Sequence, residues 1–164
     1  MFPKPNDNSG FTMIEMVAVI VIIGILAAVA ISRAMDTSTY SVLSEAGILK
    51  DNLRYAQMKA MGDIAPDTWG INIRGNSYTL VCTGANCPSP VPNLPGDSSV
   101  THAFAPGSNV TATPAATNPI YFDTWGEPVD GTGTPLAGNV SLSLACSSQT
   151  AAITVTANTG FVHE

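Results

Sequence analysis

The chain begins with a short polar segment and then becomes apolar for the length of a membrane span. From Phe11 to Ser32 the one charged side chain is Glu15, near the start of the run. About 20 consecutive apolar residues cross a bilayer as a helix, and no proline occurs between Phe11 and Ala65. The pattern predicts a transmembrane or assembly helix over 11–32.

The helical pattern continues over 33–62 as an amphipathic segment. A stripe recurs there at spacings of three and four residues, and charged residues are expected mainly off it. A break is possible at 36–39, where polar and β-branched residues lower helix propensity, and Gly62 and Pro66 are expected to end the helix. The stripe comprises Leu43, Ala46, Lys50, Leu53, Ala56 or Gln57, and Ala60, widened by Leu49 and Met61, and the residues off it are Glu45, Asp51, Arg54 and Lys59.

From Thr68 onward the period changes to two, which is typical of β-strands. Strands at 69–73 and 77–82 are predicted to form a hairpin, followed by a proline-rich loop over 83–97. Further strands are expected at 100–104, 110–113, 120–122, 140–145 and 153–156. One long helix followed only by strands predicts an α+β fold, with an antiparallel sheet or sandwich packed on the helix and a β-rich head over 63–164.

Glu15 needs an explanation, because a carboxylate deep in a membrane helix costs about 2.5–3.5 kcal/mol, and less near the interface. Cutting the chain after Gly10 would leave a cationic amine on Phe11, about one helical turn from Glu15. A carboxylate and an ammonium in a low-dielectric environment must pair or be neutralised. The pair could form within one chain, or between the amine of an incoming copy and the Glu15 of a subunit already assembled. The second arrangement would be an assembly device.

The segment from Gly10 to Glu15, Gly-Phe-Thr-Met-Ile-Glu, resembles the start of type IV pilin-like proteins, the prepilins and pseudopilins. In that family a short polar leader ends in Gly and is followed by Phe-Thr-Leu-Ile-Glu and an unbroken apolar helix. Here Met13 replaces the Leu. The resemblance implies a leader peptide over 1–10, cleavage between Gly10 and Phe11 by prepilin peptidase, N-methylation of Phe11, and a Phe11–Glu15 charge pair in assembly.

The same resemblance implies a structural subunit with no cofactor. It would span the inner membrane once, contacting its lipid, with the head in the periplasm. An inner-membrane assembly platform would then transfer it into a helical filament of pilin or pseudopilin subunits. We expect no enzymatic activity, because no nucleophile elbow, phosphate loop or zinc motif appears in the sequence.

Shorter stretches resemble one branch of the family, the minor pilins of the FimT and pseudopilin-H type. They are Leu53–Gln57, Ile120–Asp123 with Gly126–Pro128, and Ile153–Thr156 with Thr159–Val162. Minor pilins of MSHA-type pili look similar. The resemblance therefore implies a minor pilin of a type IV pilus, with a minor pseudopilin of a type II secretion system as the alternative.

Two departures from the family change what is expected. Many major pilins have proline where this chain has Ser32, and their helix loosens between a glycine like Gly24 and that proline, so this transition is in doubt here. Some FimT-like proteins bind DNA through arginines near the C-terminal glycine, but 158–164 holds no Arg or Lys, and the net charge is −6. Because neutralising phosphates requires cations, no direct binding of nucleic acid is expected.

Two readings compete with the prepilin interpretation. Ala28-Val29-Ala30 is a possible signal-peptidase site, which would make the mature chain start at Ile31. A plain single-pass anchor is the other possibility. Either would make the protein a secreted or membrane-anchored periplasmic binding domain, and both leave Glu15 and the Gly10–Phe11 junction unexplained.

Three cysteines in an extracytoplasmic chain suggest one disulfide and one remaining thiol. Cys82 and Cys87 are favoured as partners, because a glycine-containing spacer of four residues can turn back on itself, although Cys146 could compete for either. No metal site is expected at these cysteines, and the two histidines, His102 and His163, are expected at the surface. The acidic residues of one loop, Asp123, Glu127 and Asp130, are calcium candidates against the alternative of a solvated turn.

Overall fold

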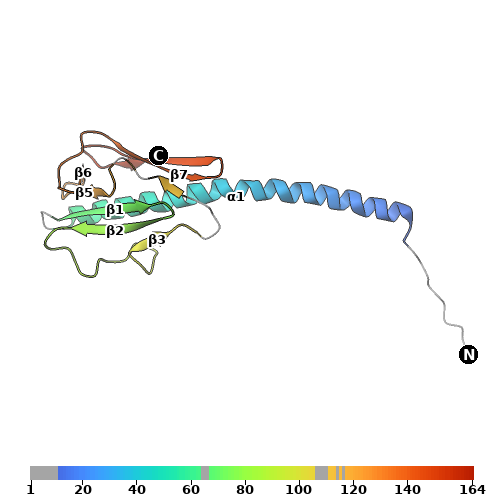
Figure 1. The fold of residues 1–164 in the computed structure, drawn as a ribbon, viewed down its shortest axis with the longest axis horizontal. Helices are drawn as coiled ribbons and strands as arrows, with labels where there is room; N and C mark the ends of the chain where they lie inside the picture. Colours follow the sequence, from blue (N-terminus) through green and yellow to red (C-terminus); the bar gives the residue numbers. More distant parts are fainter. Residues whose placement is uncertain (1–10, 64–66, 106–110, 114, 116) are drawn as a thin grey trace, which may run out of the picture. The chain divides into compact units, whose positions relative to one another are not determined.

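The computed structural model describes residues 11–63, 67–105, 111–113, 115 and 117–164 (Figure 1). The chain divides into two compact units, residues 1–37 and 38–164. The described part of the first unit is almost entirely helix, whereas the second holds the rest of that helix and every described strand.

The predicted helix is present as α1, which spans Met13–Met61 and includes 36–39. The helix ends at Met61, directly before Gly62, as the sequence predicted. The N–H of Gly62 bonds to the carbonyls of Met58 (3.1 Å) and Lys59 (3.2 Å), and the N–H of Asp63 bonds to that of Ala60 (3.3 Å). These shorter-range bonds satisfy carbonyls that would otherwise lack partners at the helix end.

The first sheet has five strands in the order β3-β2-β1-β5-β6, with all neighbouring pairs antiparallel. The strands are β1 (Thr68–Arg74), β2 (Ser77–Thr83), β3 (Thr101–Ala103), β5 (Ile120–Phe122) and β6 (Pro128–Val129). The predicted hairpin is confirmed, since Arg74 pairs with Ser77 and leaves a two-residue turn. Gly75, the first turn residue, has φ +56°, which glycine adopts without steric strain.

The second sheet has four strands in the order β4-β7-β8-β9, and its neighbours are also antiparallel. They are β4 (Thr111–Thr113), β7 (Val140–Cys146), β8 (Gln149–Val155) and β9 (Val162–His163). The sequence prediction placed only the second half of β8, because its first half lacks large apolar residues. It missed β6 and β9, since two residues are too few to show a period.

One hydrophobic core joins the second half of α1 to both sheets, and Figure 1 shows this part of the helix running alongside β1. Leu49 and Leu53 of α1, Phe122 of the first sheet and Ile153 of the second are each 0% exposed. The α+β fold with antiparallel sheets packed on the helix is therefore confirmed.

The buried face of α1 is rotated from the predicted stripe. Leu43 and Met61 were expected inside but are 52% and 50% exposed. Glu45 was expected outside but is only 6% exposed. Its carboxylate can be buried because polar groups of the head form hydrogen bonds with it. The apolar residues that are buried along the helix in the second unit are Val42, Ala46, Leu49, Leu53, Ala56 and Ala60.

Candidate functional site

The N-terminal end of α1 is closed by a reciprocal capping box. The hydroxyl of Thr12 accepts the N–H of Glu15 (3.3 Å), and the Glu15 carboxylate accepts the N–H of Thr12 (3.4 Å). A Thr followed three residues later by Glu is the sequence signal for this motif. The sequence reasoning missed it, because it considered Glu15 only as a charge. Glu15 therefore has a local hydrogen-bonding role in the uncut chain.

The two residues of the predicted cleavage site are placed differently. Gly10 lies outside the described residues, whereas Phe11 precedes the helix and is 81% exposed. In the uncut chain Phe11 carries a peptide N–H, so the amine expected to pair with Glu15 would exist only after cleavage. The Phe11–Glu15 charge pair stays a prediction.

The apolar segment Met13–Ile31 is uncovered along its whole length. Its large side chains are exposed by 47% at Val19 to 88% at Met13. Burying one such side chain is worth about 1.5–3 kcal/mol, so lipid or other apolar helices are favourable surroundings for it. Within the described residues, this is the one helix long and apolar enough to cross a membrane.

These two units define a class of protein, a membrane-anchored subunit with a pilin-like α+β fold. Residues 5–31 match the family model of the prokaryotic N-terminal methylation motif. This match supports a type IV pilin-like prepilin or pseudopilin, a family of structural proteins rather than enzymes. No curated protein and no solved structure matches the chain.

The disulfide predicted between Cys82 and Cys87 is present, with Cα atoms 5.8 Å apart. It closes a loop that packs on Asp67, whose carboxylate accepts the N–H of Asn86 (3.3 Å). Gly84 lies so close to Asp67 that a Cβ at this position would overlap its side chain. The third cysteine, Cys146, is buried in β7.

The calcium candidates Asp123, Glu127 and Asp130 form no ligand set among the described residues, and the carboxylates of Asp123 and Asp130 each organise a turn. Asp123 Oδ1 accepts the N–H groups of Trp125 and Glu127, each at 2.9 Å. Asp130 Oδ1 accepts the hydroxyl (2.6 Å) and the N–H (2.8 Å) of Thr132, and these bonds hold the pKa of Asp130 below its usual value. In the part of the chain that the structure describes, no group of three or more His, Cys, Asp or Glu could hold a metal ion.

The expectation of a surface position is wrong for His102, which joins a polar cluster between β3 and α1. Its Nε2 lies 3.1 Å from Glu45 Oε2, and its Nδ1 lies 2.9 Å from Asp97 Oδ2. The imidazole stacks on Tyr78, with ring centroids 4.9 Å apart. Glu45 Oε1 also accepts the N–H of Ala105 (3.0 Å). The cluster therefore fastens the chain on both sides of β3 to the helix.

The surroundings of His102 shift its protonation. Burial lowers the pKa of the imidazole, but hydrogen bonds to Glu45 and Asp97, together with their negative charges, outweigh burial and raise it. Burial likewise raises the pKa of the neighbouring Tyr78, against a smaller lowering by the hydrogen bond from the Asn52 amide (2.8 Å). The cluster is thus a partly buried hydrogen-bonded network that favours the charged imidazole.

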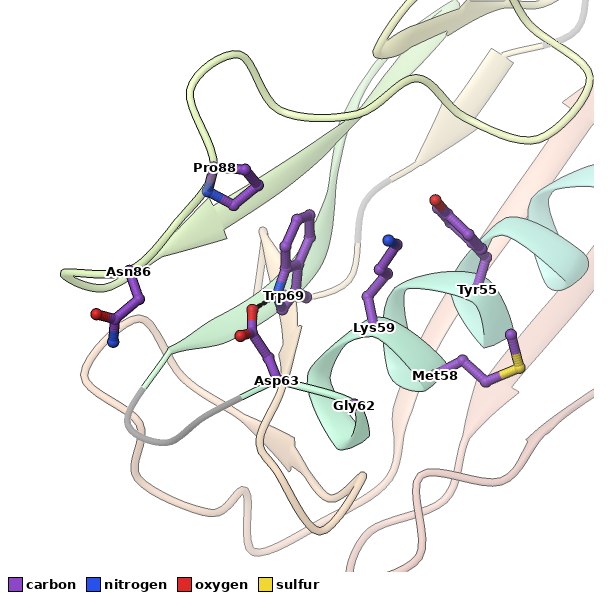
Figure 2. A pocket seen from close by; sticks show the side chains of 8 residues that line it. All are labelled: Tyr55, Met58, Lys59, Gly62, Asp63, Trp69, Asn86 and Pro88. Atoms are coloured by element: carbon purple, nitrogen blue, oxygen red, sulfur yellow. Dashed lines mark hydrogen bonds between the residues drawn. The ribbon is translucent and has the colours of Figure 1, made fainter.

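A cavity of about 620 Å³ lies at the C-terminal end of α1 (Figure 2). The Nζ of Lys59 is 5.7 Å from the ring centroid of Tyr55 and 5.8 Å from that of Trp69, within the range of cation–π attraction. Trp69 Nε1 donates to Asp63 Oδ2 (2.7 Å), which fixes the indole. No pattern in the sequence pointed to this cavity. It is lined by Tyr55, Met58, Lys59, Gly62, Asp63, Trp69, Asn86 and Pro88.

Proposed function

We propose that this protein is a structural subunit, and a minor one, of a type IV pilus or a related filament such as the type II secretion pseudopilus. The observation that carries the proposal is the uncovered apolar surface of Met13–Ile31, in a chain whose residues 5–31 match the methylation motif. A helix that its own chain leaves bare must be covered by lipid or by other helices. The segment lies in the inner membrane before assembly, with the head in the periplasm, and packs among other subunits afterwards.

Cleavage changes the partners available to Glu15. In the uncut chain its carboxylate accepts the peptide N–H of Thr12, a neutral donor. Prepilin peptidase would cut between Gly10 and Phe11 and methylate the new N-terminus. The hydrogen-bond donor then available to the Glu15 carboxylate is a cationic amine. Charge-assisted hydrogen bonds are about twice as strong as neutral ones. An incoming subunit's amine can therefore displace the local cap and hold the two chains in register.

The assignment to the minor subunits is supported by hydrogen bonds in the head that join the three stretches resembling minor pilins. Gln57 of α1 donates its amide to the carbonyl of Gly126 (2.9 Å) and to that of Thr159 (3.2 Å). These three residues belong to the three separate stretches that resemble the FimT and pseudopilin-H branch. Arg54, beside Gln57 in the first stretch, donates to the carbonyl of Val162 (3.0 Å). The residues of these stretches thus act together, because they hold the C-terminal part of the head on the helix.

The intact mass of the mature protein, extracted from the membrane of the source cells, tests the proposal. We expect a chain that starts at a methylated Phe11. Gly10→Asp should block the cut and leave the full precursor. The matched variant Ala30→Leu, which removes the possible signal-peptidase site, should change the mass only by its own substitution. A wild-type chain that starts at Ile31 would overturn the proposal.

A further inference from the structure

Trp125 is the most exposed large apolar side chain among the described residues of the head, at 83%. It stands in a turn that is fixed on both sides. Asp123 Oδ1 accepts the N–H groups of Trp125 and Glu127, and Asp123 O accepts that of Gly126 (2.9 Å). A large aromatic on a fixed backbone has no backbone entropy left to lose on binding, so its presentation favours contact with a partner.

The end of α1 extends this apolar surface. The side chain of Met61 lies against the Trp125 turn, since a Cβ on Gly126 would be 3.0 Å from Met61 Sδ. Met58 lies three positions before Met61, on the same face of the helix. Met58 is 64% exposed and Met61 is 50% exposed. Trp125, Met58 and Met61 are called the Trp125 patch below.

The cavity at Lys59 adjoins the patch, because Met58 lines it as well (Figure 2). Lys50 and Arg54 have carboxylate partners in Glu164 and Asp51. Lys59 instead lies between two aromatic rings, and no carboxylate of the described chain forms an ion pair with it. In a protein of net charge −6, this ammonium is placed to meet a carboxylate from outside.

We propose that the Trp125 patch and the Lys59 cavity form one docking surface for a neighbouring filament subunit that presents a carboxylate beside an apolar hollow. The inference rests on the proposed function and adds to it the surface through which the head meets its neighbour. Trp is enriched among the residues that dominate protein interfaces, and exposed Met adapts to irregular protein surfaces.

The test places a photo-crosslinking benzoylphenylalanine at Trp125 in the full-length chain, expressed in the source cells, with the same probe at Thr132 of a different exposed turn as control. We expect an adduct with another filament subunit, identified by peptide mass, at about tenfold higher yield from position 125. Adding Lys59→Glu should lower that yield about fivefold, as expected for the loss of one partly exposed ion pair. Lys59→Gln should lower it less, and Arg74→Glu, at an exposed cation elsewhere, should leave it unchanged.

The absence of a subunit adduct, or adducts only with polysaccharide or lipid, would overturn the docking surface. So would an adduct with a subunit whose yield is unaffected by both Lys59 variants. The intact mass is read from the same cells. A chain that starts at methylated Phe11 but gives no adduct refutes only the docking surface, whereas a chain that starts at Ile31 refutes the filament function itself.

Discussion

Replacing His102 with Leu tests whether the buried polar cluster stabilises the head. Leucine is close to histidine in volume, so the substitution removes two hydrogen bonds with little change in packing. Glu45, which is 7% exposed at its side chain, loses the donor 3.1 Å away and retains the N–H of Ala105. Asp97, which is 25% exposed, can be hydrated in place of its bond to the ring.

The magnitude follows from these two exposures. A hydrogen bond to a charged group contributes about 1.5–3 kcal/mol when buried, and the bond to Asp97 contributes less because water reaches it. The uncompensated carboxylate of Glu45 dominates the loss. We expect His102→Leu to lower the free energy of unfolding by about 2–3 kcal/mol, which lowers the Tm by about 6–12 °C for a head of this size.

The wild type should also show a pH dependence that the variant lacks. The folded-state pKa of His102 is raised above its usual value of 6.5. The stabilisation is therefore fully present below about pH 6.5 and is lost as the pH rises through the folded-state pKa. Thermal unfolding in detergent, followed by circular dichroism across this range, measures both effects, and hydrogen exchange at the Ala105 amide locates them.

The other histidine supplies the control. His163 stacks on Phe161 and lies 2.8 Å from the carbonyl of Glu164 through its Nδ1, without a buried carboxylate. His163→Leu should lower the Tm by only a few degrees and leave the pH dependence in place. Equal effects of the two variants, or an unchanged pH slope in His102→Leu, would refute the reasoning.

Three further predictions follow from other parts of the molecule. Glu15→Val should leave cleavage and membrane insertion intact but reduce incorporation into filaments, measured by immunoblot of sheared filaments; normal incorporation would exclude the charge-pair mechanism. Cys82→Ser should lower the free energy of unfolding by about 2 kcal/mol, the entropy of closing so short a loop, and wild type under reducing conditions should unfold at the same denaturant concentration as the variant. Gly160→Ala should cost about 2–4 kcal/mol, since Gly160 has φ +62° and a Cβ there would overlap the carbonyl of Gly126. Gly138→Ala, where nothing lies within 4 Å, is its control in the same unfolding assay.

Some features of the fold could be predicted because their causes lie close together in the chain. The length of the apolar run, the helix stop at Gly62 and the hairpin around Gly75 each depend on a few neighbouring residues. The capping box of Thr12 and Glu15 was equally local and could have been found. The rotation of the second half of α1 was harder, because successive residues are about 100° apart around a helix. A rotation of the stripe by less than this angle was enough to expose Leu43 and bury Glu45, while Leu49 and the other central apolar residues of the stripe stayed buried as predicted.

The sequence by itself determined the N-terminal part of this protein, where Gly10 to Glu15 and the apolar residues after them carry the family motif and need no tertiary contact. Only the tertiary structure decided which polar residues of the head meet. Glu45 and His102 are 57 positions apart, and Gln57 and Thr159 are 102 apart. A carboxylate as buried as that of Glu45 is strongly unfavourable without a partner such as the partly buried imidazole of His102. Whether they pair depends on how two sheets and a helix share one core, which no local pattern of residues encodes.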